Sequence, residues 1–221
     1  MAGELDSDTI AKAYAGWAPV YDLVFGAVFD AGRRASIAAA ERIGGRILDV
    51  GVGTGISLAD YSRRNRIVGV DYSQPMLRKA HERVIRHKLS HIDGLAVMDA
   101  QRLGFPDAVF DVVVAQYVIT AVPSPEATLD EFVRVIKPGG EIILVNHLGA
   151  EAGLLRDLEH MFAPLARRLG WRPEFEWARL ARWAERQAGV RVIERRALPP
   201  FRLFSLIRFG RDAAAATAAA G

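Results

Sequence analysis

The stretch Leu48-Asp49-Val50-Gly51-Val52-Gly53-Thr54-Gly55 decides the fold of this chain. It completes the apolar run 46–50, which predicts a buried strand, and it leads into a predicted helix. Glycines at such a turn let a ligand approach the backbone closely, because a Cβ would collide with it. The dinucleotide fingerprint G-x-G-x-x-G needs glycine at position 56, where this chain has Ile56, and this mismatch disfavours an NAD site.

Four more apolar runs follow, and helical patterns separate them. One helix is predicted to begin after a Ser73 cap and another at Ser124-Pro125, and the turn Lys137–Gly140 is predicted to end the latter. Continuous apolar strands that alternate with helices predict a parallel sheet covered on both faces. The predicted strands are 66–70, 95–98, 109–115 and 141–146.

The chain beyond residue 147 departs from this simple alternation. Helical patterns at 153–169 and 174–187 precede two predicted strands at 190–197 and 201–209. The two strands are joined around Pro199-Pro200, which predicts a hairpin-like pair with one antiparallel strand. The extra helix is a candidate cap over a site.

Composition excludes several classes of protein. The chain has 221 residues, 51% hydrophobic and 25% charged, as expected of a globular domain rather than a disordered or fibrous chain. It has no cysteine, which excludes a disulfide framework and a cysteine-ligated metal site. Its longest uncharged stretch, 112–125, is shorter than the roughly 20 residues of a membrane-spanning helix. Residues 1–8 do not form a secretory signal, so we expect a cytoplasmic protein.

Two acidic residues follow the next two predicted strands. Asp71 ends the second strand, about 20 residues after Gly51, where an acid can accept both hydroxyls of a ribose or can begin a helix. Asp99 follows the third strand and can accept the amino group of an adenine. Strand ends of a parallel sheet meet at its carboxyl edge, where ligands of open α/β folds bind. No lysine or arginine in these loops can meet a pyrophosphate, so the set favours an adenosine with a cationic group.

Over roughly residues 46–147 the sequence resembles the class I S-adenosylmethionine-dependent methyltransferases. The glycine motif of that family matches 49–55 (DVGVGTG), and its ribose and adenine acids match Asp71 and Asp99. Its segment after the fourth strand matches 114–117, and its Lys-Pro-Gly-Gly turn matches 137–140. The resemblance implies S-adenosylmethionine as cofactor and S-adenosylhomocysteine as product. The cofactor-binding residues that it implies are Asp49, Gly51, Gly53, Thr54, Asp71, Tyr72, Met76, Asp99, Ala100, Gln101, Gln116 and Trp17.

The expected fold is an α/β, doubly wound, Rossmann-like sheet of seven strands, mostly parallel with the last strand antiparallel. We expect a single methyltransferase domain over 1–221. Its expected parts are an N-terminal amphipathic helical lid (1–30), a cofactor-binding core (31–147), cap helices (148–189), a terminal strand pair (190–210) and a flexible tail (211–221).

The flanks 14–22, 25–29, 145–147 and 198–204 are similar to bacterial phospholipid N-methyltransferases, which methylate phosphatidylethanolamine stepwise to phosphatidylcholine. The similarity implies phosphatidylethanolamine and its methylated forms as substrates, reached by peripheral binding to the anionic inner leaflet of the cytoplasmic membrane. It implies neither a nucleic acid nor an obligate protein partner. The alternatives are a methyltransferase for a soluble amine or a quinone-type small molecule, and a cofactor-binding or membrane-curving protein without turnover.

Methyl transfer to an amine needs an aligned nitrogen and a proton acceptor, because an ammonium with a pKa near ~10 must lose a proton before it attacks. His147 directly follows the fifth strand and is the candidate acceptor, or a structural histidine. Tyr21 and Tyr117 are candidate catalytic residues whose rings can attract a methylated cation, or they are core residues. His87 and His91 have the spacing of a metal pair but no acidic partner, so we expect no metal.

Binding to the lipid needs cations and an apolar face. Ile10, Tyr14, Trp17 and Tyr21 follow a 4-3-4 spacing that predicts an amphipathic helix, which can lie in a membrane interface or pack on its own core. The C-terminal part is basic, which suits a phosphate or a solvated surface. The candidate ligands for the headgroup phosphate are Arg167, Arg168, Arg195, Arg196 and Arg202.

Overall fold

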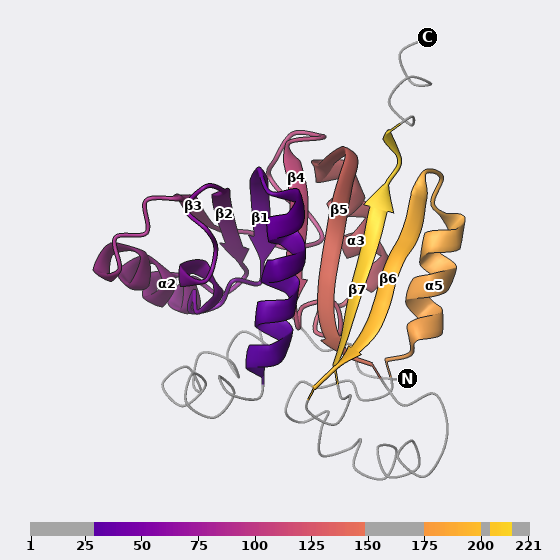
Figure 1. Cartoon of the computed structure of the whole chain (residues 1–221), viewed down its shortest axis with the longest axis horizontal. Helices are drawn as coiled ribbons and strands as arrows, with labels where there is room; N and C mark the ends of the chain where they lie inside the picture. Colours follow the sequence, from indigo (N-terminus) through magenta and orange to yellow (C-terminus); the bar gives the residue numbers. More distant parts are fainter. Residues whose placement is uncertain (1–28, 149–174, 200–203, 214–221) are drawn as a thin grey trace.

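The computed structural model of the chain describes residues 29–148, 175–199 and 204–213. Seven strands of this described part form one sheet in the order β3-β2-β1-β4-β5-β7-β6 (Figure 1). Neighbours from β3 to β5 pair in parallel, whereas β7 runs antiparallel to both β5 and β6. The predicted Rossmann-like fold with an antiparallel last strand is therefore confirmed. The strands are β1 (Arg46–Val50), β2 (Arg66–Asp71), β3 (Ile92–Val97), β4 (Phe110–Gln116), β5 (Ile136–His147), β6 (Val190–Leu198) and β7 (Phe204–Arg211).

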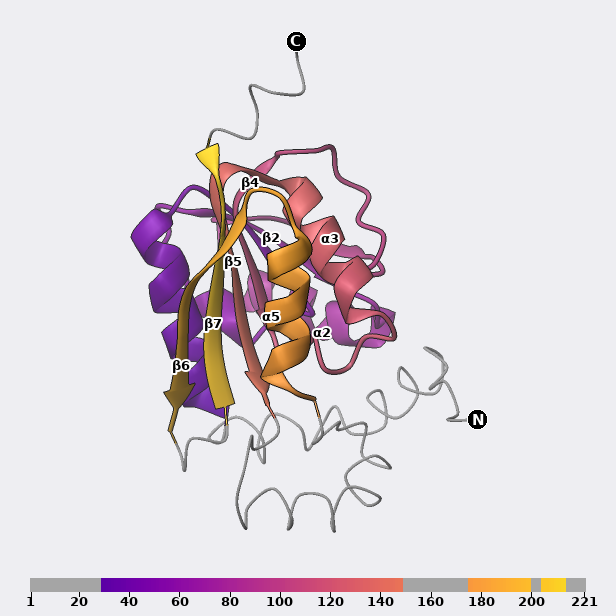
Figure 2. The ribbon, with the colours of Figure 1, turned by 90° about the vertical axis from the view of Figure 1, so that its right-hand side faces the viewer.

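Helices cover both faces of the sheet (Figure 2). One face packs against the helix at 29–43 and α2, and the other packs against α3 and α5. Both faces of β5 are buried. Ile143 and Val145 belong to the core on the side of the helix at 29–43 and α2, whereas Ile142 and Leu144 belong to the core on the side of α3 and α5. This double coverage explains why the central strands are continuous apolar runs. The labelled helices are η1 (Ser57–Ala59), α2 (Gln74–Arg86), α3 (Pro125–Val135) and α5 (Trp177–Arg186).

The prediction of a helix directly after the glycine-rich loop is wrong. The chain there makes a single 3-10 turn, η1, closed by bonds from Leu58 N–H to Gly55 O and from Asp60 N–H to Ser57 O. Bonds of this short span tighten the turn, and a 3-10 turn rarely runs beyond three or four residues. The helix that covers this part of the sheet precedes β1 instead, at 29–43.

The predicted turn Lys137–Gly140 also needs correction, because it lies within β5. Phe110 pairs with Ile136 and Val112 pairs with Glu141, so the four residues 137–140 stand opposite Asp111 alone. The segment is thus a bulge within the strand. A Cβ at Gly140 would lie 2.7 Å from Asp111 O, and this close approach is why the bulge needs a glycine.

Ser73 caps α2 in position but not by a side-chain bond. Its hydroxyl has no hydrogen-bond partner, and its backbone N–H donates instead to Asp71 Oδ1 at 2.8 Å. The Asp71 carboxylate thus binds the N–H of the N-cap residue itself, and no side chain caps the first turn of α2. The second helix after residue 147 is confirmed as α5, with Leu180 and Trp183 buried.

Several predicted segments lie outside the described residues. They include the N-terminal lid up to residue 28, the first cap helix at 153–169, and the tail from 214 onward. In the described ranges, no helix is long and apolar enough to cross a bilayer.

Candidate functional site

The glycine-rich loop after β1 lies against the loop after β4. Gly51 N–H donates to Val70 O at 2.8 Å, and a Cβ added at Gly51 would lie 2.2 Å from Val118 Cγ2. Of the residues that the structure describes, a Cβ at Gly53 would meet only Gly51 O, at 4.0 Å, so one side of this residue is open within the described part. Both glycines have left-handed φ values, of 70° and 56°. The loop thus combines a glycine that packing requires with a glycine beside which a ligand can lie.

Asp71, the last residue of β2, turns its carboxylate toward this loop. Its Oδ2 accepts the Gly53 N–H and its Oδ1 accepts the Ser73 N–H, each at 2.8 Å. A carboxylate oxygen has two acceptor positions, so each oxygen can accept one more donor, which suits the two hydroxyls of a ribose. Burial raises the pKa of Asp71 above its ordinary 3.8, and the two backbone hydrogen bonds oppose that rise.

Asp99 lies two residues after β3 and organises a tight turn. Its Oδ1 accepts the Gln101 N–H at 2.9 Å, and its backbone O accepts the Arg102 N–H at 3.0 Å. The N–H of Met98 donates to Asp71 O at 3.1 Å, so this turn is bonded to the end of β2. The structure therefore brings together the glycine loop, Asp71 and Asp99, as the sequence predicts, with half-buried Ala100 in the same turn.

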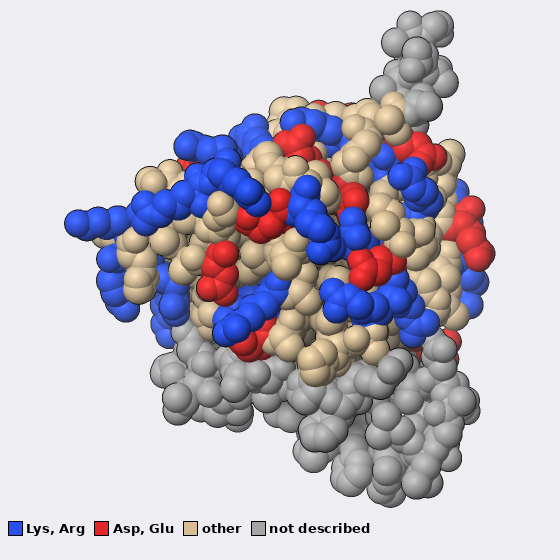
Figure 3. Space-filling view, in the orientation of Figure 1, with Lys and Arg blue, Asp and Glu red and all other residues tan. Residues whose placement is uncertain are grey.

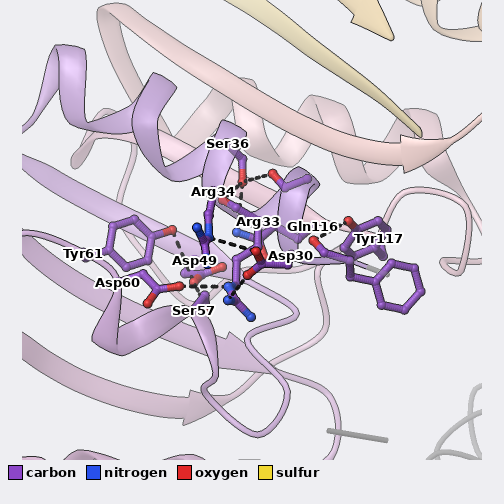
Figure 4. Close-up of polar contacts among 12 residues, drawn as sticks. Asp30, Arg33, Arg34, Ser36, Asp49, Ser57, Asp60, Tyr61, Gln116 and Tyr117 are labelled. Carbon is purple, nitrogen blue, oxygen red and sulfur yellow. Dashed lines mark hydrogen bonds and ion pairs between the residues drawn. The ribbon is translucent and has the colours of Figure 1, made fainter. Parts of the chain in front are cut away.

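Asp49 lies beneath the loop rather than on its open side. It is 2% exposed, and its Oδ2 accepts the Ser57 hydroxyl at 2.8 Å and the Tyr61 hydroxyl at 3.3 Å (Figure 4). Burial raises the pKa of Asp49 from 3.8 to about 7, although the bond from Ser57 lowers it in part. Ser57 and Tyr61 were not predicted, because the glycine-rich loop and the turn after it, rather than one regular element, separate them from Asp49. The only signal was a polar residue close after the glycine motif.

The loop after β4 is fastened to the helix at 29–43 (Figure 4). Gln116 Nε2 donates to Ser36 Oγ at 3.0 Å, and the Tyr117 hydroxyl donates to Phe29 O at 3.1 Å. Tyr117 has a φ of 64°, a left-handed conformation that a residue with a bulky side chain rarely adopts. Such outliers persist where the surroundings hold them, and they cluster at functional sites.

A second fastening joins the same helix to the turn after the glycine loop. Arg33 Nε lies 2.8 Å from Asp60 Oδ2, and Arg33 also pairs with Asp30. Figure 4 shows this ion-paired group beside Asp49 and its hydroxyl partners. The helix at 29–43 therefore contacts both loops that flank the end of β1.

His147 and Tyr117 lie at the carboxyl edge, and both contact one phenyl ring. The Phe204 ring centre is 5.3 Å from that of Tyr117 and 6.3 Å from that of His147. Phe29 completes the group, at 4.3 Å from Tyr117. The structure thus brings two of the three predicted catalytic residues to one aromatic cluster, and the third, Tyr21, lies outside the described residues.

The other predicted binding residues differ in exposure. Tyr72 follows Asp71 and is 47% exposed, whereas Thr54 and Met76 are buried. Trp17 lies outside the described residues. The roles of all these residues toward a cofactor stay predictions.

Several arginines of the basic C-terminal part have partners on the protein. Arg195 stacks over the Trp177 ring at 4.8 Å, and Arg196 pairs with Glu194 at 2.8 Å. Arg208 bridges Glu141 and Glu194 at 2.8 and 3.0 Å. On the face in Figure 3, basic and acidic side chains are interspersed. The other headgroup candidates, Arg167, Arg168 and Arg202, lie outside the described residues.

Comparison with known proteins points to one family. Residues 48–144 match the family model described as a methyltransferase domain. Over 207 residues the chain is 38% identical to a phosphatidylethanolamine N-methyltransferase of Cereibacter sphaeroides, covering 94% of this chain and 100% of the relative. A demethylmenaquinone methyltransferase of Thermus thermophilus is 35% identical and covers 58% of this chain and 61% of the relative.

Solved structures agree on the fold. The YcgJ protein of Bacillus has a TM-score of 0.66 at 20% identity, and the match covers 80% of this chain and 95% of that one. A SAM-dependent methyltransferase of Aquifex aeolicus has a TM-score of 0.57 at 15% identity, with 80% and 89% covered. At these identities the likeness concerns the fold alone.

Proposed function

Because this chain belongs to the class I S-adenosylmethionine-dependent methyltransferases, we propose that it methylates the amine of phosphatidylethanolamine stepwise to phosphatidylcholine. The observation that carries this proposal is the extent of one match. The phosphatidylethanolamine N-methyltransferase of Cereibacter sphaeroides aligns along 94% of this chain and along its own full length. The match therefore includes flanks on both sides of the methyltransferase domain at 48–144.

The residues at the carboxyl edge fit S-adenosylmethionine. The open side of Gly53 gives a ligand room beside the backbone, and Asp71 has an acceptor position on each oxygen for the ribose. When bound, this cofactor supplies a methyl group on a positively charged sulfur. Asp71, and Asp49 beneath the loop, place negative or ionisable groups at the end of the sheet where that charge would lie.

The transfer itself depends on alignment. With S-adenosylmethionine bound, the amine nitrogen would form its bond to the methyl carbon as the carbon–sulfur bond breaks, which would leave a neutral thioether. Alignment of this kind can contribute several kcal/mol, with ~7–11 as the upper range. The amine gives its proton to a base, and we propose His147 for this role because it ends β5 at the same edge. For the later, methylated forms, the Tyr117 ring offers an aromatic face.

The lipid substrate stays in a bilayer, so the enzyme must meet it there. We propose that the segment up to residue 30 docks reversibly on an anionic membrane surface, through the aromatic spacing that includes Trp17 and Tyr21. The mixed charges of the described surface do not provide a wide basic patch of their own on the face in Figure 3.

A second candidate function is the methylation of a quinone ring. The demethylmenaquinone methyltransferase of Thermus thermophilus matches at 35% identity, but over 58% of this chain. That match supports the same cofactor chemistry but covers a smaller share of this chain than the match to the phosphatidylethanolamine N-methyltransferase, so we place it second.

The test uses the full chain, labelled S-adenosylmethionine and vesicles. Vesicles of phosphatidylethanolamine with an anionic lipid should yield mono-, di- and trimethylated lipid, identified by mass spectrometry. Demethylmenaquinone in the same vesicles, without phosphatidylethanolamine, is the matched alternative, and Asp71→Ala is the negative control. Label in the quinone but not in the lipid would overturn the proposal.

A further inference from the structure

A buried polar cluster lies at the carboxyl end of β5. Asn146 is 0% exposed, and its Nδ2 donates to Thr120 Oγ1 in the loop after β4, at 3.0 Å. Ser205 of β7 stands directly opposite Asn146 in the antiparallel register and is also buried. Directly opposite residues project to the same face of a sheet. Three polar side chains therefore gather on the face that α3 and α5 otherwise cover with apolar groups.

The unusual atom of this cluster is the amide oxygen of Asn146. Asn146 Oδ1 is buried and has no hydrogen-bond partner among the residues that the structure describes. Buried acceptors without a donor are rare, because the oxygen has lost its bond to water and gained none in return. An unpartnered buried oxygen in a polar cluster is thus ready to bind a donor that a ligand brings.

The cluster lies beside the loops that flank the candidate cofactor site. Val118 packs against Gly51 of the glycine loop, and Thr120, two residues further along, holds Asn146. His147 directly follows Asn146 and projects to the other side of the strand, because successive strand residues alternate. The proposed base and the unpartnered oxygen are therefore adjacent along the chain at the end of β5 and project to opposite faces of the sheet.

We propose that Asn146 Oδ1 accepts an N–H of the methyl-acceptor amine and holds its nitrogen in place for transfer, an inference that rests on the proposed function. An amide oxygen is an acceptor and does not take up a proton at neutral pH. Asn146 therefore binds the amine, while the proton passes to another group. Because Asn146 is fully buried, the amine must displace neighbouring side chains to reach it, and the bond then forms away from water, where it is stronger.

This role has a consequence for the order of methylations. The ammonium of phosphatidylethanolamine has three N–H groups, and each methylation replaces one of them. As ammonium ions, all three acceptors can thus donate to Asn146, whereas phosphatidylcholine has no N–H to offer. The attacking nitrogen is that of the neutral amine, which keeps two N–H groups in phosphatidylethanolamine, one in its monomethylated form and none in its dimethylated form. Asn146 would therefore hold the nitrogen through the first two transfers, and the third would proceed without this bond.

The experiment compares wild type with Asn146→Leu and Asn146→Asp in vesicles of phosphatidylethanolamine and an anionic lipid. We expect Asn146→Leu to raise the KM for phosphatidylethanolamine roughly ten- to a hundredfold, the range of a hydrogen bond to a charged group. Inhibition by added phosphatidylcholine should stay the same, and so should the Kd for S-adenosylmethionine by calorimetry. Asn146→Asp keeps an acceptor oxygen in either protonation state, so its KM should stay within a few-fold of wild type.

The matched control is Asn65→Leu, which removes a buried amide at the opposite, amino edge of the sheet. It should lower the melting temperature without changing the KM. If Asn146→Leu does not fold, Asn146→Ala carries the same expectation. An unchanged KM in a folded Asn146 variant, with wild type active on the lipid, would overturn the inference alone. A wild type that transfers no methyl group to phosphatidylethanolamine would overturn the proposed function and the inference with it.

Discussion

The buried carboxyl of Asp49 predicts an unusual dependence of stability on pH. Burial raises its pKa in the folded protein from 3.8 to about 7. Between these two values the folded chain keeps the proton while the unfolded chain has lost it, so the free energy of unfolding falls as pH rises. The difference of about 3 pKa units corresponds to roughly 4 kcal/mol, lost between about pH 4 and pH 7 and constant above.

The variant Asp49→Asn isolates this effect. Asparagine has the shape of the protonated acid, and its amide oxygen can still accept the hydroxyls of Ser57 and Tyr61. We expect it to be more stable than wild type, with an advantage that grows by roughly 3 kcal/mol from pH 5 to pH 8. Urea unfolding of both proteins at each pH measures it, and all other titrating groups cancel in the comparison. A difference that does not vary with pH would refute the assignment of the raised pKa to Asp49.

Three other predictions concern the cofactor loops. Asp71→Ala should weaken S-adenosylmethionine binding at least roughly a hundredfold, because each lost bond to a carboxylate is worth about 1.5–3 kcal/mol; an unchanged Kd by calorimetry would refute the placement of the ribose. Since Asp71 also accepts two backbone N–H groups, we expect a lower melting temperature as well, with Asp71→Asn intermediate in both measurements. Gly51→Ala should cost more stability than Gly53→Ala, because only the first meets Val118, and overpacking costs typically ~1–3 kcal/mol. Equal losses in urea unfolding would contradict this packing argument. At pH 7 about half of the Asp49 side chains hold a proton, so binding of a cationic cofactor should release up to ~0.5 proton. Calorimetry in two buffers of different ionisation enthalpy measures this release. The same binding enthalpy in both buffers would show that Asp49 does not respond.

The sequence was sufficient to predict the parallel strands because each one is a local pattern, whereas the seven-stranded arrangement was implied by the family resemblance. Each parallel strand is an apolar run flanked by turn residues. Because both faces of such a strand are buried, the run is continuous and differs clearly from the polar loops on either side. The errors occurred where a backbone detail depends on a distant partner. The bulge at 137–140 exists because β5 must pass Asp111 of β4, and no residue within the bulge itself records that register.

The candidate site divides in the same way. Asp71 could be predicted, since it ends the strand that follows the glycine-rich loop and lies about 20 residues after Gly51, the spacing that a nucleoside-binding α/β fold requires. Tyr61 and Thr120 could not be predicted, because each contacts its partner, Asp49 of β1 or Asn146 of β5, only when a segment outside that strand folds against the strand's carboxyl end. The two members of such a pair have no fixed separation in the sequence. These pairs nevertheless decide which buried polar atoms have a hydrogen-bond partner.

These two kinds of residue correspond to two parts of the proposed reaction. The cofactor loops are held by backbone hydrogen bonds, and Asp71 is already oriented by Gly53 and Ser73, so binding requires little further ordering. Relatives named for different acceptors share this part, since the quinone methyltransferase of Thermus thermophilus matches over 58% of the chain. Under the proposed function, we expect the acceptor to be selected by residues at the ends of β4 and β5 and by the flanks outside the methyltransferase domain at 48–144. Exchanging Asn146 should therefore change which acceptor is bound, whereas exchanging Asp71 should weaken transfer to every acceptor alike.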